Sequence, residues 1–207
     1  AFLRYHETSS QLWERQALIK ARVIVAESAF ADTVSAVLER VTYATEIDAA
    51  GVAEIDRLRG RIENELAHEQ AGRFNIKTGR GGIVDIEFLV QMLQLRYGLQ
   101  LPALRQRATL PALQALRACG VLPEDDFAML FRGYRFLRTL ENRLRIERDQ
   151  PVEALESGNE QLTSLARRLG YEGEDAAARL LMDYQNQREA VRACYSRWFA
   201  REKGQKA

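Results

Sequence analysis

The 207-residue chain has few of the residues that build metal sites, disulfide scaffolds or membrane spans. It contains two cysteines and two histidines, so a zinc site of cysteine and histidine ligands is close to excluded. No segment approaches about 18 consecutive apolar residues, so none is predicted to span a membrane. With 30 Lys and Arg against 29 Asp and Glu, the chain lacks the excess positive charge of a dedicated nucleic-acid binder.

The two cysteines, Cys119 and Cys194, lie within apolar helical patterns. Such positions favour buried free thiols in a reducing cytoplasm. No secretion signal is visible, which agrees with a cytoplasmic location. At 46% hydrophobic residues the chain can bury a substantial core, so a disordered tail is excluded.

Apolar residues recur at three- and four-residue spacing along nearly the whole chain. This predicts an all-α fold, an antiparallel helical bundle of about eight helices with no significant sheet. The expected helices span residues 9–26, 28–41, 49–71, 83–97, 109–120, 123–148, 159–169 and 174–201.

We expect one helical domain over residues 1–201. It would contain three leading helices, then a glycine-rich turn with its motif helix, then the C-terminal helices, over residues 1–72, 73–98 and 99–201. Residues 202–207 are expected to form a frayed tail.

The helical pattern breaks after Gly72. An extended piece over residues 73–77 leads into a basic, glycine-rich turn that feeds the next helix. Backbone N–H groups at such a helix start can bind an anion, with added charge from nearby cations. A phosphate site is therefore one prediction, with candidate residues Lys77, Gly79, Arg80, Gly81 and Gly82. The alternative is a tight turn in which Asp85 stabilises the first helical turn.

Four further groups of polar residues are candidates for a functional role. Asp85 and Glu87 do not form a metal-binding pair, because residues two apart on a helix point about 200° from each other. Glu87, Gln91 and Gln94 share one polar face, which fits a cleft, a contact with another domain or a solvated face. A third group is the helical edge with Arg15, Lys20 and Arg22. The fourth consists of the arginines of helix 123–148, and we interpret these arginines as solvated.

Three stretches together resemble one known family. They are NIKTGRGGIVDIEFLVQ at 75–91, WERQALIKAR at 13–22 and YRFLRTLEN at 134–142. They resemble the glutamine synthetase adenylyltransferases, which are bifunctional adenylylating and adenylyl-removing enzymes. The resemblance covers nearly the whole chain.

The resemblance implies that catalysis and the helical fold belong to different domains. In that family each half pairs a polymerase-β-type nucleotidyltransferase domain with a following helical domain, which is related to that of PII uridylyltransferases. The family's Gly-Ser…Asp-x-Asp centre is absent from this sequence, so no catalytic residue and no metal ligand are expected in it. ATP and Mg²⁺ would be bound mainly by the missing nucleotidyltransferase domain, and the chain alone would be inactive.

The resemblance also implies a reaction and partners. The intact enzyme transfers AMP from ATP to a tyrosine of glutamine synthetase. Its partners would be glutamine synthetase, the PII signal protein and the preceding nucleotidyltransferase domain. The Lys77–Gln91 block and the Arg15, Lys20 and Arg22 edge would face that domain, closing the nucleotide cleft or bracing the contact.

We favour the adenylylating, C-terminal half. Two alternatives stay open: a non-catalytic module that binds PII or glutamine synthetase, and the helical domain of the adenylyl-removing half.

Overall fold

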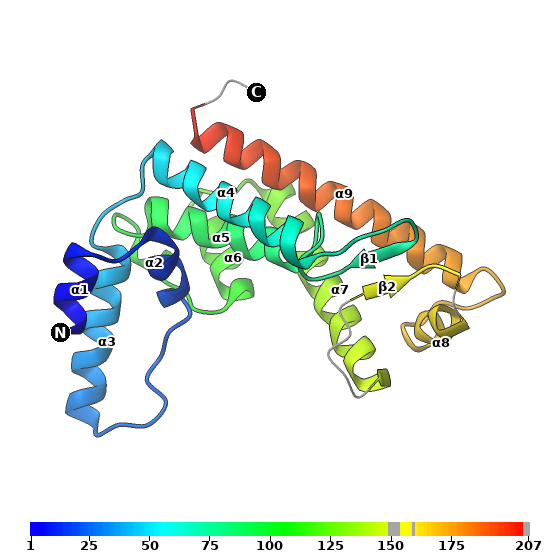
Figure 1. The fold of residues 1–207 in the computed structure, drawn as a ribbon, viewed down its shortest axis with the longest axis horizontal. Helices are drawn as coiled ribbons and strands as arrows, with labels where there is room; N and C mark the ends of the chain where they lie inside the picture. The colour runs from blue at the N-terminus through cyan, green and yellow to red at the C-terminus, as the bar shows by residue number, and fades with distance from the viewer. Residues whose placement is uncertain (149–153, 159, 205–207) are drawn as a thin grey trace. The chain divides into compact units, whose positions relative to one another are not determined.

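A computed structural model describes residues 1–148, 154–158 and 160–204 (Figure 1). The expected all-α class is confirmed. Helices make up almost all of the described elements, and the one small exception is an antiparallel pair of short strands. In chain order the elements are α1 (Phe2–Thr8), α2 (Leu12–Leu18), α3 (Ser28–Tyr43), α4 (Ala49–Leu66), β1 (Arg73–Asn75), α5 (Ile83–Tyr97), η1 (Pro102–Leu104), α6 (Thr109–Ala118), α7 (Glu124–Arg148), β2 (Ala154–Glu156), α8 (Glu160–Arg168) and α9 (Ala176–Glu202). Within the described part of the chain, no helix is both long and apolar enough to cross a membrane.

The chain forms two compact units. Unit 1 comprises Ala1–Leu58, Phe88–Phe127 and the residues from Phe199 onward. Unit 2 comprises Arg59–Glu87 and Ala128–Trp198. The unit boundaries fall inside α4, α5, α7 and α9. A single domain over residues 1–201 stays a prediction.

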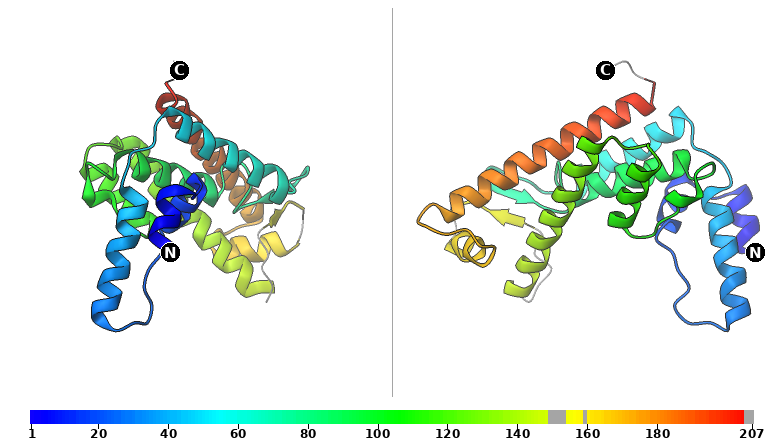
Figure 2. Two further views of the ribbon diagram at one scale, coloured as in Figure 1. Left: turned by 60° about the vertical axis from the view of Figure 1, so that its left-hand side comes forward. Right: turned by 180° about the vertical axis from the view of Figure 1, so that it is seen from behind.

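Unit 1 contains α1, α2, α3, η1, α6 and most of α4 and α5. Figure 2 shows α1 lying beside α3, and α2 also packs against α3. The apolar stripe predicted for α5 is buried here, where Leu89 and Leu93 are fully inaccessible to solvent and Val90 is also buried. Burying each such side chain contributes about 1.5–3 kcal/mol, so this stripe anchors the unit.

Unit 2 contains the sheet, α8 and most of α7 and α9. In the sheet, β1 pairs with β2 in antiparallel register, with Phe74 opposite Leu155. The extended piece predicted after Gly72 is therefore confirmed over Arg73–Asn75. Its partner strand was not foreseen, because a strand of three residues leaves too little alternation to recognise.

The expected helix over residues 9–26 is wrong. Two short helices, α1 and α2, meet at Ser9 and Ser10, whose N–H groups both bond to the carbonyl of Tyr5 and end α1. A capping box between Gln11 and Glu14 then begins α2. Beyond α2 the residues up to Glu27 form turns and a loop.

Other boundaries also differ from the expectations. The helix expected over residues 49–71 ends at Leu66, because His68 adopts a left-handed conformation with φ of 46°. Glu202, expected to fray, lies inside α9, where its carboxylate accepts a hydrogen bond from the Tyr97 hydroxyl at 2.9 Å. Residues 205–207 of the expected tail lie outside the described residues. Both cysteines are free; Cys194 is buried as predicted, but Cys119 is partly exposed.

Candidate functional site

The glycine turn, residues 75–82, is closed by the side chain of its first residue. Asn75 Oδ1 accepts hydrogen bonds from the backbone N–H groups of Lys77 at 3.0 Å and Thr78 at 2.9 Å. The carbonyl of Asn75 accepts a third, from the N–H of Gly79 at 3.0 Å. One asparagine therefore organises the first half of the turn, as Asx turns commonly do.

Asp85 closes the second half of the turn. Its Oδ2 accepts a hydrogen bond from the N–H of Gly81 at 2.8 Å, and the N–H of Gly82 bonds to the carbonyl of Gly79 at 3.0 Å. The N–H groups of Lys77, Thr78, Gly79, Gly81 and Gly82, which an anion would need as donors, are thus already engaged inside the protein. This geometry matches the alternative in which Asp85 stabilises the start of α5, rather than an open phosphate cradle.

The glycines of the turn provide space for neighbouring atoms of the protein. A Cβ at Gly79 would collide with the Asn75 carbonyl and the Glu69 carboxylate. At Gly81 it would collide with the backbone of Arg188, and there φ is also +71°. These residues therefore permit close packing, which is the second common use of glycine besides ligand approach.

Buried ion pairs hold the turn in place. Arg59 and Asp85 are 1% and 0% exposed and lie 2.5 Å apart, and Arg59 also donates to the carbonyl of Gly79 at 2.9 Å. Arg192 of α9 contacts Asp85 at 3.2 Å and Glu63 of α4 at 3.0 Å. Burial lowers the pKa of Arg192, but Asp85 and Glu63 more than offset this, so its pKa is raised.

A second arginine of α9 completes this arginine network, which consists of Arg59, Arg188, Arg192, Glu63, Glu69 and Asp85. Arg188 donates to the carbonyl of Arg80 at 3.1 Å and contacts Glu69 at 2.9 Å. Glu69 in turn accepts a hydrogen bond from the N–H of Asn75 at 3.0 Å. Three cations face three carboxylates, so the arginine network is formally neutral and fixes the turn without leaving a net charge.

Two predicted site residues lie at the rim of the turn. Arg80 is exposed and pairs with Glu189 of α9 at 2.5 Å. That hydrogen bond lowers the pKa of Glu189, and the charge of Arg80 lowers it further. Lys77 is half-buried. Of these two cations, Arg80 is the exposed one.

The polar face of α5 is not solvated. Glu87 accepts a hydrogen bond from the Tyr134 hydroxyl at 2.9 Å, in unit 2. In unit 1, Gln91 is buried and accepts one from Gln16 at 2.8 Å, and buried Gln94 donates to the carbonyl of Leu104 at 2.6 Å. Glu87 and Asp85 have different partners, as the helical geometry predicts.

The predicted basic edge of the first helix is not assembled. Arg15 donates to the carbonyls of Thr42 at 3.0 Å and Thr45 at 2.6 Å, and burial lowers its pKa. Lys20 and Arg22 lie on the loop after α2 and are exposed. Because α2 ends at Leu18, the three cations do not share a helical face.

Sequence reasoning missed the arginine network and a buried carboxylate on α7. Glu141 is fully buried and pairs with Arg138 at 2.6 Å and Arg145 at 2.8 Å. The arginines of this helix are largely solvated as interpreted, since Arg132, Arg135, Arg143 and Arg145 are exposed. A signal was present for the arginine network, because Arg59 lies between apolar positions of the α4 stripe and Arg188 between apolar positions of α9. A charge within an apolar stripe indicates a buried ion pair.

The fold and this site define a helical domain built around an internally bonded glycine turn. The family model of GlnD PII-uridylyltransferase matches residues 53–199, and the chain belongs to this family. Within the described residues, no group of three or more His, Cys, Asp or Glu side chains is placed to hold a metal ion.

Two curated relatives carry the same name. The chain is 36% identical over 180 residues to the bifunctional glutamine synthetase adenylyltransferase/adenylyl-removing enzyme of Mesorhizobium japonicum, covering 86% of this chain and 18% of the relative. It is 32% identical over 201 residues to the enzyme of the same name from Bradyrhizobium diazoefficiens, and this alignment covers 96% of this chain and 20% of the relative. The chain thus spans about a fifth of the length of these relatives.

Proposed function

We propose that this chain is the helical domain of the adenylyl-transferring half of a glutamine synthetase adenylyltransferase. The proposal is carried by the alignment of this chain with two enzymes named bifunctional glutamine synthetase adenylyltransferase/adenylyl-removing enzyme. The two alignments cover 86% and 96% of the chain. The intact enzyme would transfer AMP from ATP to a tyrosine of glutamine synthetase and so regulate nitrogen assimilation.

The chemical step is assigned to the nucleotidyltransferase domain that we expect to precede this one. In the described residues the N–H groups of the glycine turn are bonded internally, and no acidic cluster is placed to hold a metal. These residues do not fit a phosphate cradle or a magnesium site, so we derive no step of AMP transfer through them. ATP and Mg²⁺ would bind mainly to the preceding domain.

The role proposed for this domain is to present fixed cations to the catalytic domain. Lys77 and Arg80 belong to a turn whose backbone is bonded by Asn75 and Asp85, so their Cα atoms are held in place. A cation held in advance stabilises developing phosphate charge without reorganisation during the reaction. The PII signal protein stays a proposed partner of the intact enzyme.

The test uses the full-length parent enzyme with the double substitution Lys77→Ala and Arg80→Ala. We expect AMP transfer to glutamine synthetase to fall by about tenfold or more, the usual effect of losing an electrostatic contact to the transition state. Glu189→Ala is the matched control, because it breaks the same exposed ion pair but keeps both cations. Its transfer rate should equal that of the unsubstituted enzyme.

The same variants separate the alternatives. Loss of phosphorolytic AMP removal, with transfer intact, would assign the chain to the adenylyl-removing half. Unchanged rates in both directions would overturn the cationic role and favour a binding module. The coding sequence provides an independent check, since a Gly-Ser…Asp-x-Asp block should lie within about 150 residues upstream, a typical domain length.

One observation favours the binding module as a second candidate. Ile24, Val25 and Phe30 are 82%, 90% and 63% exposed on the loop before α3 and the start of that helix. Grouped exposed apolar side chains are typical of protein contact sites. Under this proposal, replacing Ile24 and Val25 with Ser would weaken binding of glutamine synthetase or PII in pull-down and leave intrinsic turnover unchanged.

A further inference from the structure

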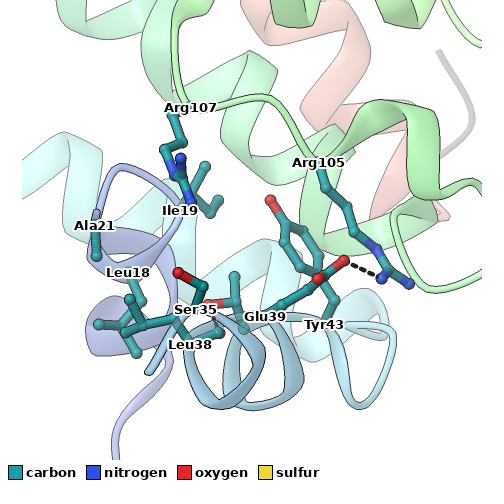
Figure 3. Close-up of a pocket in the computed structure, with 10 residues that line it drawn as sticks. Leu18, Ile19, Ala21, Ser35, Leu38, Glu39, Tyr43, Arg105 and Arg107 are labelled. Carbon is teal, nitrogen blue, oxygen red and sulfur yellow. Dashed lines mark hydrogen bonds and ion pairs between the residues drawn. The ribbon is translucent and has the colours of Figure 1, made fainter. Parts of the chain in front are cut away.

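Unit 1 contains an open pocket that takes no part in the glycine turn. Its volume is about 150 Å³, and its walls come from the end of α2, one side of α3 and the segment after η1 (Figure 3). Leu18 and Leu38 provide apolar wall, while Tyr43, Arg105 and Arg107 provide polar groups. A cavity of roughly this size holds a molecule as large as benzene.

One of the two pocket arginines is already neutralised. Arg105 contacts Glu39 at 2.5 Å and donates from Nε to the carbonyl of Gly98 at 2.9 Å. Its guanidinium also lies over the Tyr43 ring, 5.3 Å from the ring centre. Arg105 and Glu39 therefore form a fixed, neutral part of the wall.

The other arginine leaves a positive charge at the pocket. Arg107 makes no hydrogen bond or ion pair with the residues that the structure describes. Arg107 and Tyr43 both line the pocket, and Figure 3 shows the Tyr43 hydroxyl on the side of its ring towards Arg107. Burial raises the pKa of Tyr43 to about 12, although the charge of Arg107 acts to lower it, so its hydroxyl remains a neutral donor under physiological conditions.

We propose that this pocket binds a small organic carboxylate. The carboxylate would lie between the Arg107 guanidinium and the Tyr43 hydroxyl, with a short apolar body against Leu18 and Leu38. The planar guanidinium fork matches a carboxylate, and one uncompensated cation balances one negative charge. A phosphate dianion would keep excess charge and would not use the apolar wall. The proposal is independent of the function proposed for the glycine turn.

The test is a titration of the ¹⁵N-labelled 207-residue chain, followed by NMR. Benzoate should shift the Arg107 Nε–H signal and the Leu38 amide signal in a saturable way, with a Kd of about 1 mM or below. Benzamide has the same size and shape but no charge, and it should bind about tenfold more weakly or worse, because it lacks the charge-assisted bond. Inorganic phosphate should also bind more weakly than benzoate.

Two variants locate the site. Arg107→Ala should weaken benzoate binding by about tenfold or more, and Arg107→Gln should weaken it as well while keeping a polar side chain. Arg57→Ala is the matched control, since Arg57 is an exposed arginine of unit 1 outside the pocket, and benzoate binding should be unchanged. Equal binding of benzamide, equal binding of phosphate, equal loss in Arg57→Ala or no saturable shift would each overturn the proposal.

Discussion

At the scale of single residues, the glycine turn shows why the same sequence pattern fits two structures. Glycine permits close approach, but the pattern does not say what approaches. The sequence left both an anion site and a tight turn open, and the structure places the Glu69 carboxylate and the Arg188 backbone against Gly79 and Gly81. Arg188 lies 108 positions from Arg80 of the turn, so its position cannot be obtained from local spacing.

Gly81→Ala tests this close packing against a matched position. Gly81 and Gly120 both have φ of +71°, but only Gly81 has protein atoms where a Cβ would lie. Gly120→Ala should cost about 1–2 kcal/mol from backbone strain alone. Gly81→Ala should cost about 1–3 kcal/mol more from overpacking. Urea unfolding followed by circular dichroism measures both, and equal costs would show that Gly81 is needed only for its conformation.

At the scale of elements, long apolar stripes were easier to interpret than short ones. The stripes of α3, α5, α6 and α7 gave helices close to their observed bounds, because several turns of periodicity outweigh local ambiguity. The helix expected over residues 9–26 failed because α2 ends at Leu18 in turn bonds, such as that from the Ala21 N–H to the Leu18 carbonyl, which apolar spacing does not encode. The buried arginines Arg59 and Arg188 escaped notice because Asp85 and Glu69, which pair with them, lie on other segments of the chain.

Asp85→Asn tests the arginine network that joins these elements. The change leaves Arg59, which is 1% exposed, beside an uncharged amide. Removing one partner of a buried pair typically costs about 3–5 kcal/mol. Asp56→Asn, which breaks the more exposed pair with Lys203, should cost about 1 kcal/mol or less. Denaturant midpoints compare the two, and a similar small cost for both would show that the arginine network does not stabilise the turn.

At the scale of the whole molecule, composition and periodicity were enough to predict the all-α fold class but not the internal organisation of the chain into units. The all-α class follows from apolar spacing repeated along the chain. The division into two units does not, because its boundaries fall within continuous helices. The bonding of the glycine turn also does not, because it depends on pairs between residues far apart in the chain.

Tyrosine ionisation should make the folded chain unstable at high pH. The pKa values of Tyr43 and Tyr171 are raised by burial to about 12, and burial raises that of Tyr184 further. Below pH 10, the approximate pKa of tyrosine in the unfolded chain, these tyrosines are protonated in both the folded and the unfolded state, and their contribution to the free energy of unfolding is fully present. Between about pH 10 and 12 the unfolded state loses protons first, so the free energy of unfolding falls.

Tyr184→Phe isolates one contribution to this pH dependence. Its hydroxyl is buried and has no hydrogen-bond partner among the described residues, so the variant should be at least as stable at neutral pH. Above about pH 10 its unfolding free energy should fall less steeply than that of the unsubstituted chain. Urea midpoints at several pH values provide the comparison, and identical slopes would contradict the assignment.

The long-range pairs of the arginine network also set an order of events during synthesis. Asp85 and Arg192 are 107 residues apart. At the usual rate of about 5–20 residues per second, the ribosome adds Arg192 roughly 5–20 s after Asp85. Throughout that interval the nascent turn has its glycines and its carboxylate but lacks the α9 arginines that hold it. Unit 2 is therefore completed only when the final helix has emerged from the ribosome.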